Sequence, residues 1–173
     1  RSTQAFDFPH LMMGYYNTAF RLGHGPFCQR LQSNGACGYI LPDLPIDEYG
    51  DLLTESGERE LTSVMLMTPT NTDERLAKIG DKANGFVYAV ARKGVTGSHT
   101  DLGDELYEFI ARCRQATDLP LGIGFGLRSG DDLRHLHGHA EIGIVGSELL
   151  NTWQREGEEG YRALLQDLAA GRS

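Results

Sequence analysis

Six short apolar runs recur along this chain at a nearly constant spacing, and each gives way to a helix-like stretch. The five intervals between the run ends average 26 residues, the ends falling near Tyr15, Leu41, Met67, Val90, Gly124 and Val145. One strand, one helix and two turns fill an interval of this length. Strands that alternate with helices in one unbroken run pair in parallel, with the helices outside. The spacing therefore predicts an α/β fold built from six βα units.

Helix start signals fall inside these intervals. Residues 72–74 are Thr-Asp-Glu and open a helix that runs towards residue 82, and Ser129 opens the next-to-last helix with two aspartates behind it. Asp47 precedes a helix through Leu53. Such side chains accept hydrogen bonds from the free N–H groups of a first helical turn. No composition shift or linker divides the chain, so residues 1–173 are predicted to form a single domain.

Two architectures hold six βα units. A doubly wound open sheet binds nucleotides through a G-x-G-x-x-G turn after its first strand, and no such turn follows the first run here. The glycines within residues 122–126 have another spacing and lie near the other end of the chain. A closed barrel needs eight strands and about 250 residues. Two more βα units would bring this chain close to that length. The arithmetic favours a (β/α)₈ TIM barrel, present as about six βα units without the first two strands.

Charge and composition exclude several classes of partner. The 173 residues are 40% apolar and 23% charged, with a formal net charge of −8 and a pI near 5.2. Nucleic acids and anionic membranes both require a clustered basic surface. No apolar run approaches the ~18 residues of a membrane span, and no signal peptide opens the chain, so we expect a cytoplasmic protein with neither partner. The chain begins at Arg1 without an initiator Met, which indicates either processing or a piece of a longer protein.

Cysteine and histidine spacing predicts neither a disulfide framework nor a metal site. The chain has three cysteines, Cys28, Cys37 and Cys113. They are odd in number and lack a C-x-x-C pair, so reduced thiols are expected. The histidines His135, His137 and His139 look like a metal tract, but Gly138 interrupts them and no acidic or Cys ligand pattern lies nearby. A solvated helix end and turn is favoured over a metal site, and no metal is assigned.

Two short glycine turns follow the last two apolar runs. Gly124-Phe125-Gly126 ends one run, and Gly146-Ser147 ends the next. Each turn leads from a strand into a helix, where bare backbone N–H groups and the helix dipole favour a phosphate. In a parallel barrel the phosphate site lies in the loops after strands seven and eight. The two turns therefore predict a phosphorylated small-molecule ligand.

Seven motifs in a fixed order give the chain a resemblance to a known family. They are LMMGYYN (11–17), LPDLP (41–45), TPTNTDER (68–75), GFVY (85–88), GVTG (94–97), GFG (124–126) and VGS (145–147). In this order they resemble the tryptophan synthase α subunit, a (β/α)₈ barrel that cleaves indole-3-glycerol phosphate to indole and glyceraldehyde 3-phosphate in tryptophan biosynthesis. By the resemblance, the present chain starts at strand three of that barrel and covers strands three to eight.

The resemblance implies a set of substrate-binding residues. The segment 91–97 is a glycine-containing loop that is long enough to close over a ligand as a lid. The alternative interpretation is a mobile surface loop without a role in binding. Phe125, Tyr15 and Tyr88 either face the indole and the reacting carbon or pack in the core. The expected substrate-binding residues are Tyr15, Tyr88, Arg92, Thr96, Gly97, Phe125, Gly126, Gly146 and Ser147.

The resemblance also implies a protein partner. Prolines hold Asp43 in a fixed orientation after its strand, and the simplest role for its carboxylate is a helix cap. In the family this loop and the stretch around Asn17 face a β subunit, which makes Asn17, Asp43 and Pro45 the expected interface residues. The family forms an αββα complex in which pyridoxal phosphate belongs to the β subunit, so no cofactor is expected in this chain.

The catalytic residues are the point at which the resemblance runs out. Carbon–carbon cleavage needs a proton delivered to the indole ring while another leaves the glycerol hydroxyl, and the family uses a Glu and an Asp for this. By the resemblance both lie upstream of Arg1, so no catalytic carboxylate is assigned, Tyr88 is a candidate assisting residue and the chain alone is expected to be inactive. Glu148 is a second departure, because the family has a small residue after Gly-Ser and a carboxylate there repels a phosphate.

Two other functions stay open from the sequence. One is a non-catalytic paralogue that binds a phosphate or a β subunit. The other is a phosphosugar isomerase or aldolase on the same barrel, for which no suitably placed lysine or base is found. A barrel short of two strands also leaves open edges and exposed apolar side chains, so oligomers or poor solubility are expected for the chain alone.

Overall fold

The structure is a computed structural model that describes residues 7–90, 104–124 and 126–172. Four of the predicted substrate-binding residues, Arg92, Thr96, Gly97 and Phe125, lie outside the described residues, as does the whole of the predicted lid loop 91–97.

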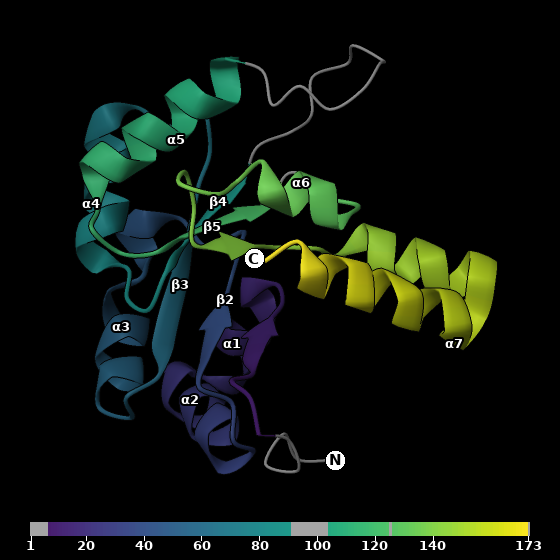
Figure 1. Cartoon of the computed structure of the whole chain (residues 1–173). Helices are drawn as coiled ribbons and strands as arrows, with labels where there is room; N and C mark the ends of the chain where they lie inside the picture. Colours follow the sequence, from purple (N-terminus) through teal and green to yellow (C-terminus); the bar gives the residue numbers. More distant parts are fainter. Residues whose placement is uncertain (1–6, 91–103, 125, 173) are drawn as a thin grey trace.

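Six parallel strands alternate with helices along the described chain (Figure 1). The strands are β1 (Leu11–Met13), β2 (Gly38–Ile40), β3 (Thr62–Met67), β4 (Val87–Val90), β5 (Leu121–Gly124) and β6 (Ile142–Gly143). The helices are α1 (Tyr16–Leu22), α2 (His24–Ser33), α3 (Gly50–Gly57), α4 (Asp73–Lys82), α5 (Asp104–Ala116), α6 (Gly130–Arg134) and α7 (Ser147–Ala170), with a short 3₁₀ helix η2 (Ile46–Glu48).

The strands lie in the sheet in the same order as in the chain. A doubly wound sheet reverses its strand order at one point, and this sheet has no reversal. Consecutive parallel neighbours with right-handed helical connections are the arrangement of a (β/α)₈ barrel. The predicted fold class is confirmed: the sheet is a curled part of such a barrel, with β1 and β6 at its two edges.

The predicted strand ends agree closely with the observed ones in the middle of the sheet. β2, β3, β4 and β5 end within one residue of the predicted positions. β1 and β6 end two residues early, although single hydrogen bonds continue the ladder from Gly14 N–H to the Ile40 carbonyl and from Ile144 N–H to the Ile123 carbonyl. Each of these strands has one neighbour, so its pairing is lost sooner than that of a central strand.

Helix starts follow the predicted signals at two of three places. Thr72 Oγ1 accepts the Arg75 N–H at 3.3 Å at the start of α4, and Ser129 forms a reciprocal capping box with Asp132 at the start of α6. Asp47, however, lies inside the short helix η2, and α3 begins only at Gly50. The Asp47 carboxylate is turned to α4, where the nitrogens of Arg75 and Lys78 lie at 3.6 and 3.5 Å.

The two faces of the sheet differ in their environment. Tyr39 stacks edge-on with Phe27 of α2 and donates to Ser56 of α3, which identifies the helix-covered face. The strand register carries this face across the sheet, because paired residues of parallel strands share a side. Its members are fully or nearly fully buried: Tyr39, Met65, Met67, Val87, Ala89, Leu121 and Ile123. The large core cluster of the described residues lies mainly here, between the sheet and the helices α2 to α5.

The opposite face is the concave one, with Leu66 on β3, Tyr88 on β4 and Gly122 and Gly124 on β5. Leu66 and Tyr88 are only half-buried, and neither belongs to the core cluster. Ile40 and Val64 lie on this face too and are buried, so the concave face leaves space mainly around Leu66 and Tyr88, near the carboxyl ends of the strands.

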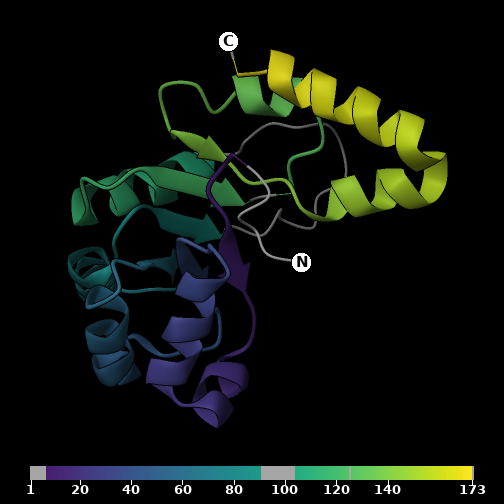
Figure 2. The same cartoon turned by 90° about the horizontal axis from the view of Figure 1, so that it is seen from below.

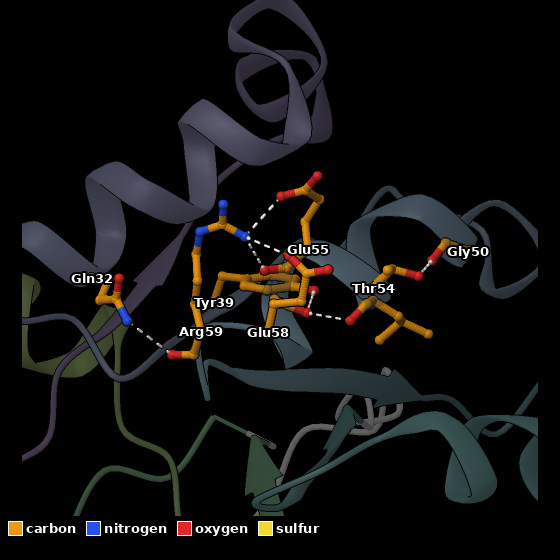
Figure 3. Close-up of polar contacts among 9 residues, drawn as sticks. Gln32, Tyr39, Gly50, Thr54, Glu55, Glu58 and Arg59 are labelled. Atoms are coloured by element: carbon orange, nitrogen blue, oxygen red, sulfur yellow. Dashed lines mark hydrogen bonds and ion pairs between the residues drawn. The ribbon is translucent and has the colours of Figure 1, made fainter.

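The outer helices are joined to one another by polar contacts as well as by the core. Arg59, just after α3, pairs with Glu55 at 2.8 Å and with Glu58 at 3.7 Å, and its carbonyl accepts from Gln32 of α2 at 3.3 Å (Figure 3). α3, α4 and α5 follow one side of the sheet, whereas α7 extends away on the other side as two arms that meet at the non-helical Gly157 (Figures 1 and 2). Within the described ranges, no helix is long and apolar enough to cross a bilayer.

Candidate functional site

A cavity of about 240 Å³ opens at the carboxyl ends of β4, β5 and β6. Four of the predicted substrate-binding residues line it: Tyr88, Gly126, Gly146 and Ser147. The spacing of the βα units explains this convergence, because the carboxyl ends of consecutive parallel strands lie along one rim of the sheet. The two glycine turns, 20 residues apart in the sequence, thus meet around one space.

Six further residues line the same cavity, namely Gly124, Leu127, Arg128, Ile144, Glu148 and Asn151. Asn151 was missed by the sequence analysis, although it lies one helical turn beyond Ser147 and the helical period predicts a shared face. Ile144 and Leu127 were missed because each reads as an ordinary core residue next to a glycine turn. Arg128 also lines this cavity, and its side chain is exposed.

Tyr88 enters the cavity because β5 has no side chain at the facing position. A Cβ added at Gly124 would overlap the ring of Tyr88, so the phenol occupies the space that this glycine leaves free. Burial raises the pKa of the Tyr88 phenol above its usual value. The group therefore stays protonated at neutral pH and acts as a hydrogen-bond donor or acceptor rather than as an anion.

The two helix starts at the cavity differ in how their N–H groups are satisfied. In the turn before α6, the Asp132 carboxylate accepts from the Arg128 N–H at 2.8 Å and from the Ser129 N–H at 3.2 Å. α7 begins at Ser147 after the N-cap residue Gly146, which has no side chain, and among the described residues no side chain accepts from its first N–H groups. The first N–H groups of a helix need an acceptor, which water or an anionic ligand supplies when no side chain does. The start of α7 is therefore the candidate anion position, and Gly126, at φ +78°, adds a left-handed turn beside it.

The other predicted ligand contact, Tyr15, lies elsewhere. It directly precedes α1, its side chain is 72% exposed, and it is not among the residues that line the cavity at the glycine turns. The chain turns from β1 into α1 within two residues, which leaves the phenol at the surface. A role for Tyr15 in binding stays a prediction.

The predicted interface residues lie together. Asp43 Oδ1 accepts the N–H of Tyr16, next to Asn17, at 2.8 Å, so the carboxylate caps the start of α1. Asp43 and Pro45 also line a second cavity, of about 290 Å³, at the ends of β2 and β3. This space is larger than the one at the glycine turns, but Arg75 at its rim pairs with Asp47 and the N-terminus of α4 is capped by Thr72. The smaller cavity is the better candidate for an anion site, since no described side chain caps its helix start.

The three histidines lie at the end of α6 and in the turn that follows, with exposed side chains. Their ring nitrogens and faces have separate partners. His135 Nδ1 lies 2.8 Å from the Asp131 carbonyl, His137 Nε2 lies 3.1 Å from the Gly171 carbonyl, and the His139 ring packs on Tyr107. Over the part of the chain that the structure describes, no three His, Cys, Asp or Glu side chains converge as metal ligands do.

A singly wound parallel sheet with an uncapped helix start after its last described strand defines a barrel-type α/β protein with a candidate anion site at its carboxyl rim. Residues 2–171 match the family described as tryptophan synthase alpha chain, and this chain belongs to that family.

Individual relatives agree with this assignment. The chain is 40% identical over 164 residues to the tryptophan synthase alpha chain of Desulforapulum autotrophicum, covering 95% of this chain and 65% of the relative. The tryptophan synthase alpha chain of Syntrophotalea carbinolica is 36% identical to this chain, with the same coverage of both proteins. A crystal structure of tryptophan synthase from M. tuberculosis superposes with a TM-score of 0.85 at 34% identity, over 95% of this chain and 62% of the other. This chain thus spans about 65% of the length of these curated relatives.

Proposed function

We infer that this chain forms the phosphate-binding part of a tryptophan synthase α subunit, a lyase that cleaves indole-3-glycerol phosphate to indole and glyceraldehyde 3-phosphate. The observation that carries the proposal is the cavity at the glycine turns, where Gly126, Gly146 and Ser147 surround an uncapped helix start and Tyr88 projects beside it. Membership of the family supports the choice of substrate.

In this proposal the phosphate lies at the first turn of α7, where backbone N–H groups and the helix dipole favour a dianion. Arg128 at the rim adds a positive charge. The indole and glycerol parts extend along the concave face past Tyr88, whose protonated phenol borders the reacting carbon. Thr96, Gly97, Arg92 and Phe125 keep their predicted roles as lid and indole contacts.

Cleavage requires positioned carboxylates near the indole ring and the glycerol hydroxyl. Of the described residues that line the cavity, Glu148 is the acidic one, and it lies at the phosphate end. We therefore propose that this chain alone binds the substrate without cleaving it, and that the family's Glu and Asp complete the site. A non-catalytic paralogue is the alternative function.

The partner belongs to the same proposal. Asp43 holds the start of α1 beside Asn17, and Phe20 on that helix is 69% exposed. A rim of this kind suits a protein interface. We propose that it docks a β subunit, which holds pyridoxal phosphate, in an αββα complex.

Indole release from indole-3-glycerol phosphate tests the proposal, with and without a tryptophan synthase β subunit. We expect substrate binding by the 173-residue chain with no indole release. Activity should appear when a polypeptide with the N-terminal third of a relative is co-expressed with the chain. Absence of both substrate binding and complemented activity would favour the non-catalytic paralogue. Indole release by the chain alone would show that the catalytic groups lie within these 173 residues.

A further inference from the structure

Glu148 lies in the first turn of α7, at the cavity that the proposed function assigns to a phosphate. Its side chain is 19% exposed, so the carboxylate is largely withdrawn from solvent. A carboxylate so close to a bound dianion opposes binding. The same helix start also attracts carboxylates, so a free Glu148 would turn back onto the N–H groups that the phosphate needs. The protein has to keep this carboxylate away from its own helix start.

Two side chains further along α7 contact the Glu148 carboxylate. Thr152 is 4% exposed, and its Oγ1 donates to Glu148 Oε1 at 3.3 Å. Arg155 Nη2 lies 3.7 Å from the same oxygen. Positions four and seven residues apart share one face of a helix, and side chains lean towards the helix N-terminus, so Thr152 and Arg155 both reach Glu148 from behind.

The two contacts differ in character. The hydroxyl of Thr152 belongs to a buried side chain with few rotamers, so it fixes the position of the carboxylate. Arg155 is 60% exposed and also bonds Glu156 through Nε at 2.7 Å, so it supplies partial charge compensation rather than a fixed geometry. The Thr152 hydroxyl should therefore matter more for ligand binding than the Arg155 guanidinium does.

We propose that Thr152 and Arg155 are positioning residues that hold Glu148 along α7 and thereby set the affinity of the cavity for phosphate esters. This inference rests on the proposed function, because it assumes that the anion lies at the start of α7. The affinity of the site then depends on the Thr152–Glu148 hydrogen bond and the Arg155–Glu148 ion pair, neither of which contacts the ligand.

Binding of glycerol 3-phosphate to the full chain, measured by titration calorimetry, tests the inference. Glu148→Gln should bind about three- to tenfold more tightly than the wild type, because one negative charge is removed near the dianion. Thr152→Val should weaken binding about three- to fivefold, and Arg155→Gln about twofold, because each releases Glu148 towards the anion position. Thr152→Ser, which keeps the hydroxyl, should restore wild-type affinity.

The double variants separate positioning from a general loss of structure. In the Glu148→Gln background, Thr152→Val and Arg155→Gln should leave the affinity unchanged, since no carboxylate remains to be held. Arg162→Gln removes a matched arginine on the second arm of α7, paired with Glu158 at 2.7 Å, and should have no effect in either background.

Two negative results would be distinct. If the wild type binds glycerol 3-phosphate and Thr152→Val binds equally well, or if Thr152→Val weakens binding as much in the Glu148→Gln background, the positioning role is wrong and the proposed function stands. If neither the wild type nor Glu148→Gln binds the ester, the start of α7 is not the anion position, and both the inference and the phosphate part of the proposed function fail.

Discussion

The two faces of the sheet divide the tasks of this protein. On β3, Met67 faces the helices and is 0% exposed, whereas its neighbour Leu66 faces the concave side and is only half-buried. β4 repeats the pattern, with Ala89 buried against the helices and Tyr88 turned to the cavity. The helix-covered face holds the core cluster together, and the carboxyl end of the concave face borders the cavity that we propose binds a ligand. Stability and binding can therefore be changed separately by residues that are adjacent in the sequence.

The largest expected effect is on stability, at the pair Met67 and Leu66. Met67→Ala should lower the free energy of unfolding by about 2–5 kcal/mol, because it leaves a cavity in the closed core. Leu66→Ala should lower it by about 1 kcal/mol, since its side chain is already half in contact with solvent. Urea denaturation of the two variants measures the difference. Equal losses would show that both faces are packed alike and would break the comparison.

The next effect is on binding, at the glycine that makes room for Tyr88. Gly124→Ala should weaken indole-3-glycerol phosphate binding about tenfold or more, because the new methyl group displaces the Tyr88 ring into the cavity. Gly50→Ala is the control on the outer layer, at the start of α3, where an added Cβ meets no atom within 4 Å. It should leave the affinity at the wild-type value. An unchanged affinity in Gly124→Ala would remove Tyr88 from the site.

The smallest effect concerns the amino end of the sheet, away from the cavity. Glu141 accepts from the Leu121 N–H at 2.7 Å and from Arg114 of α5 at 2.8 Å. Burial alone would raise the pKa of the Glu141 carboxyl, but these hydrogen bonds outweigh it and the pKa falls below its usual 4.5. A lowered folded-state pKa stabilises the protein above the unfolded value, and this contribution is lost as the pH falls through the folded value.

Glu141→Gln should therefore destabilise the chain at pH 7 by less than about 1 kcal/mol, because the group is half-exposed and screened. The difference from the wild type should shrink as the pH drops below about 4, where the wild-type carboxylate also becomes protonated. Denaturation curves at pH 7 and at low pH measure this change. Ligand affinity should not move, and a change in affinity would show that the amino and carboxyl ends of the strands are coupled.

The sequence predicted the sheet better than it predicted the difference between its faces. Regular spacing located the strand ends, and Thr72 and Ser129 marked two helix starts, because these signals are local. Strands of a parallel sheet read as continuous apolar runs, so the contrast between Met67 and Leu66 could not be read from residue types. It depends on which helices cover each face.

The candidate site was predicted in part for the same reason. The sequence identifies turn residues after two strands, Gly126, Gly146 and Ser147, from their residue types and positions. It also places Tyr88 at the end of a strand. The N–H groups at the start of α7 are more available to a ligand than those before α6, because the Asp132 carboxylate accepts from the latter. The contact of Thr152 with Glu148 depends on side-chain rotamers. Neither follows from the sequence, although the helical period does place Thr152 and Asn151 one turn beyond Glu148 and Ser147.

The central claim is that the start of α7 and the neighbouring glycine turn bind the phosphate of indole-3-glycerol phosphate. Amide chemical shifts of the ¹⁵N-labelled chain during titration with this ligand test it most directly. We expect the largest changes at the N–H groups of Gly126, Gly146 and Ser147, with little change at Met65 or Leu121 on the helix-covered face. Saturable changes confined to the loop around Asp43, or no change at any of the three amides, would contradict the claim.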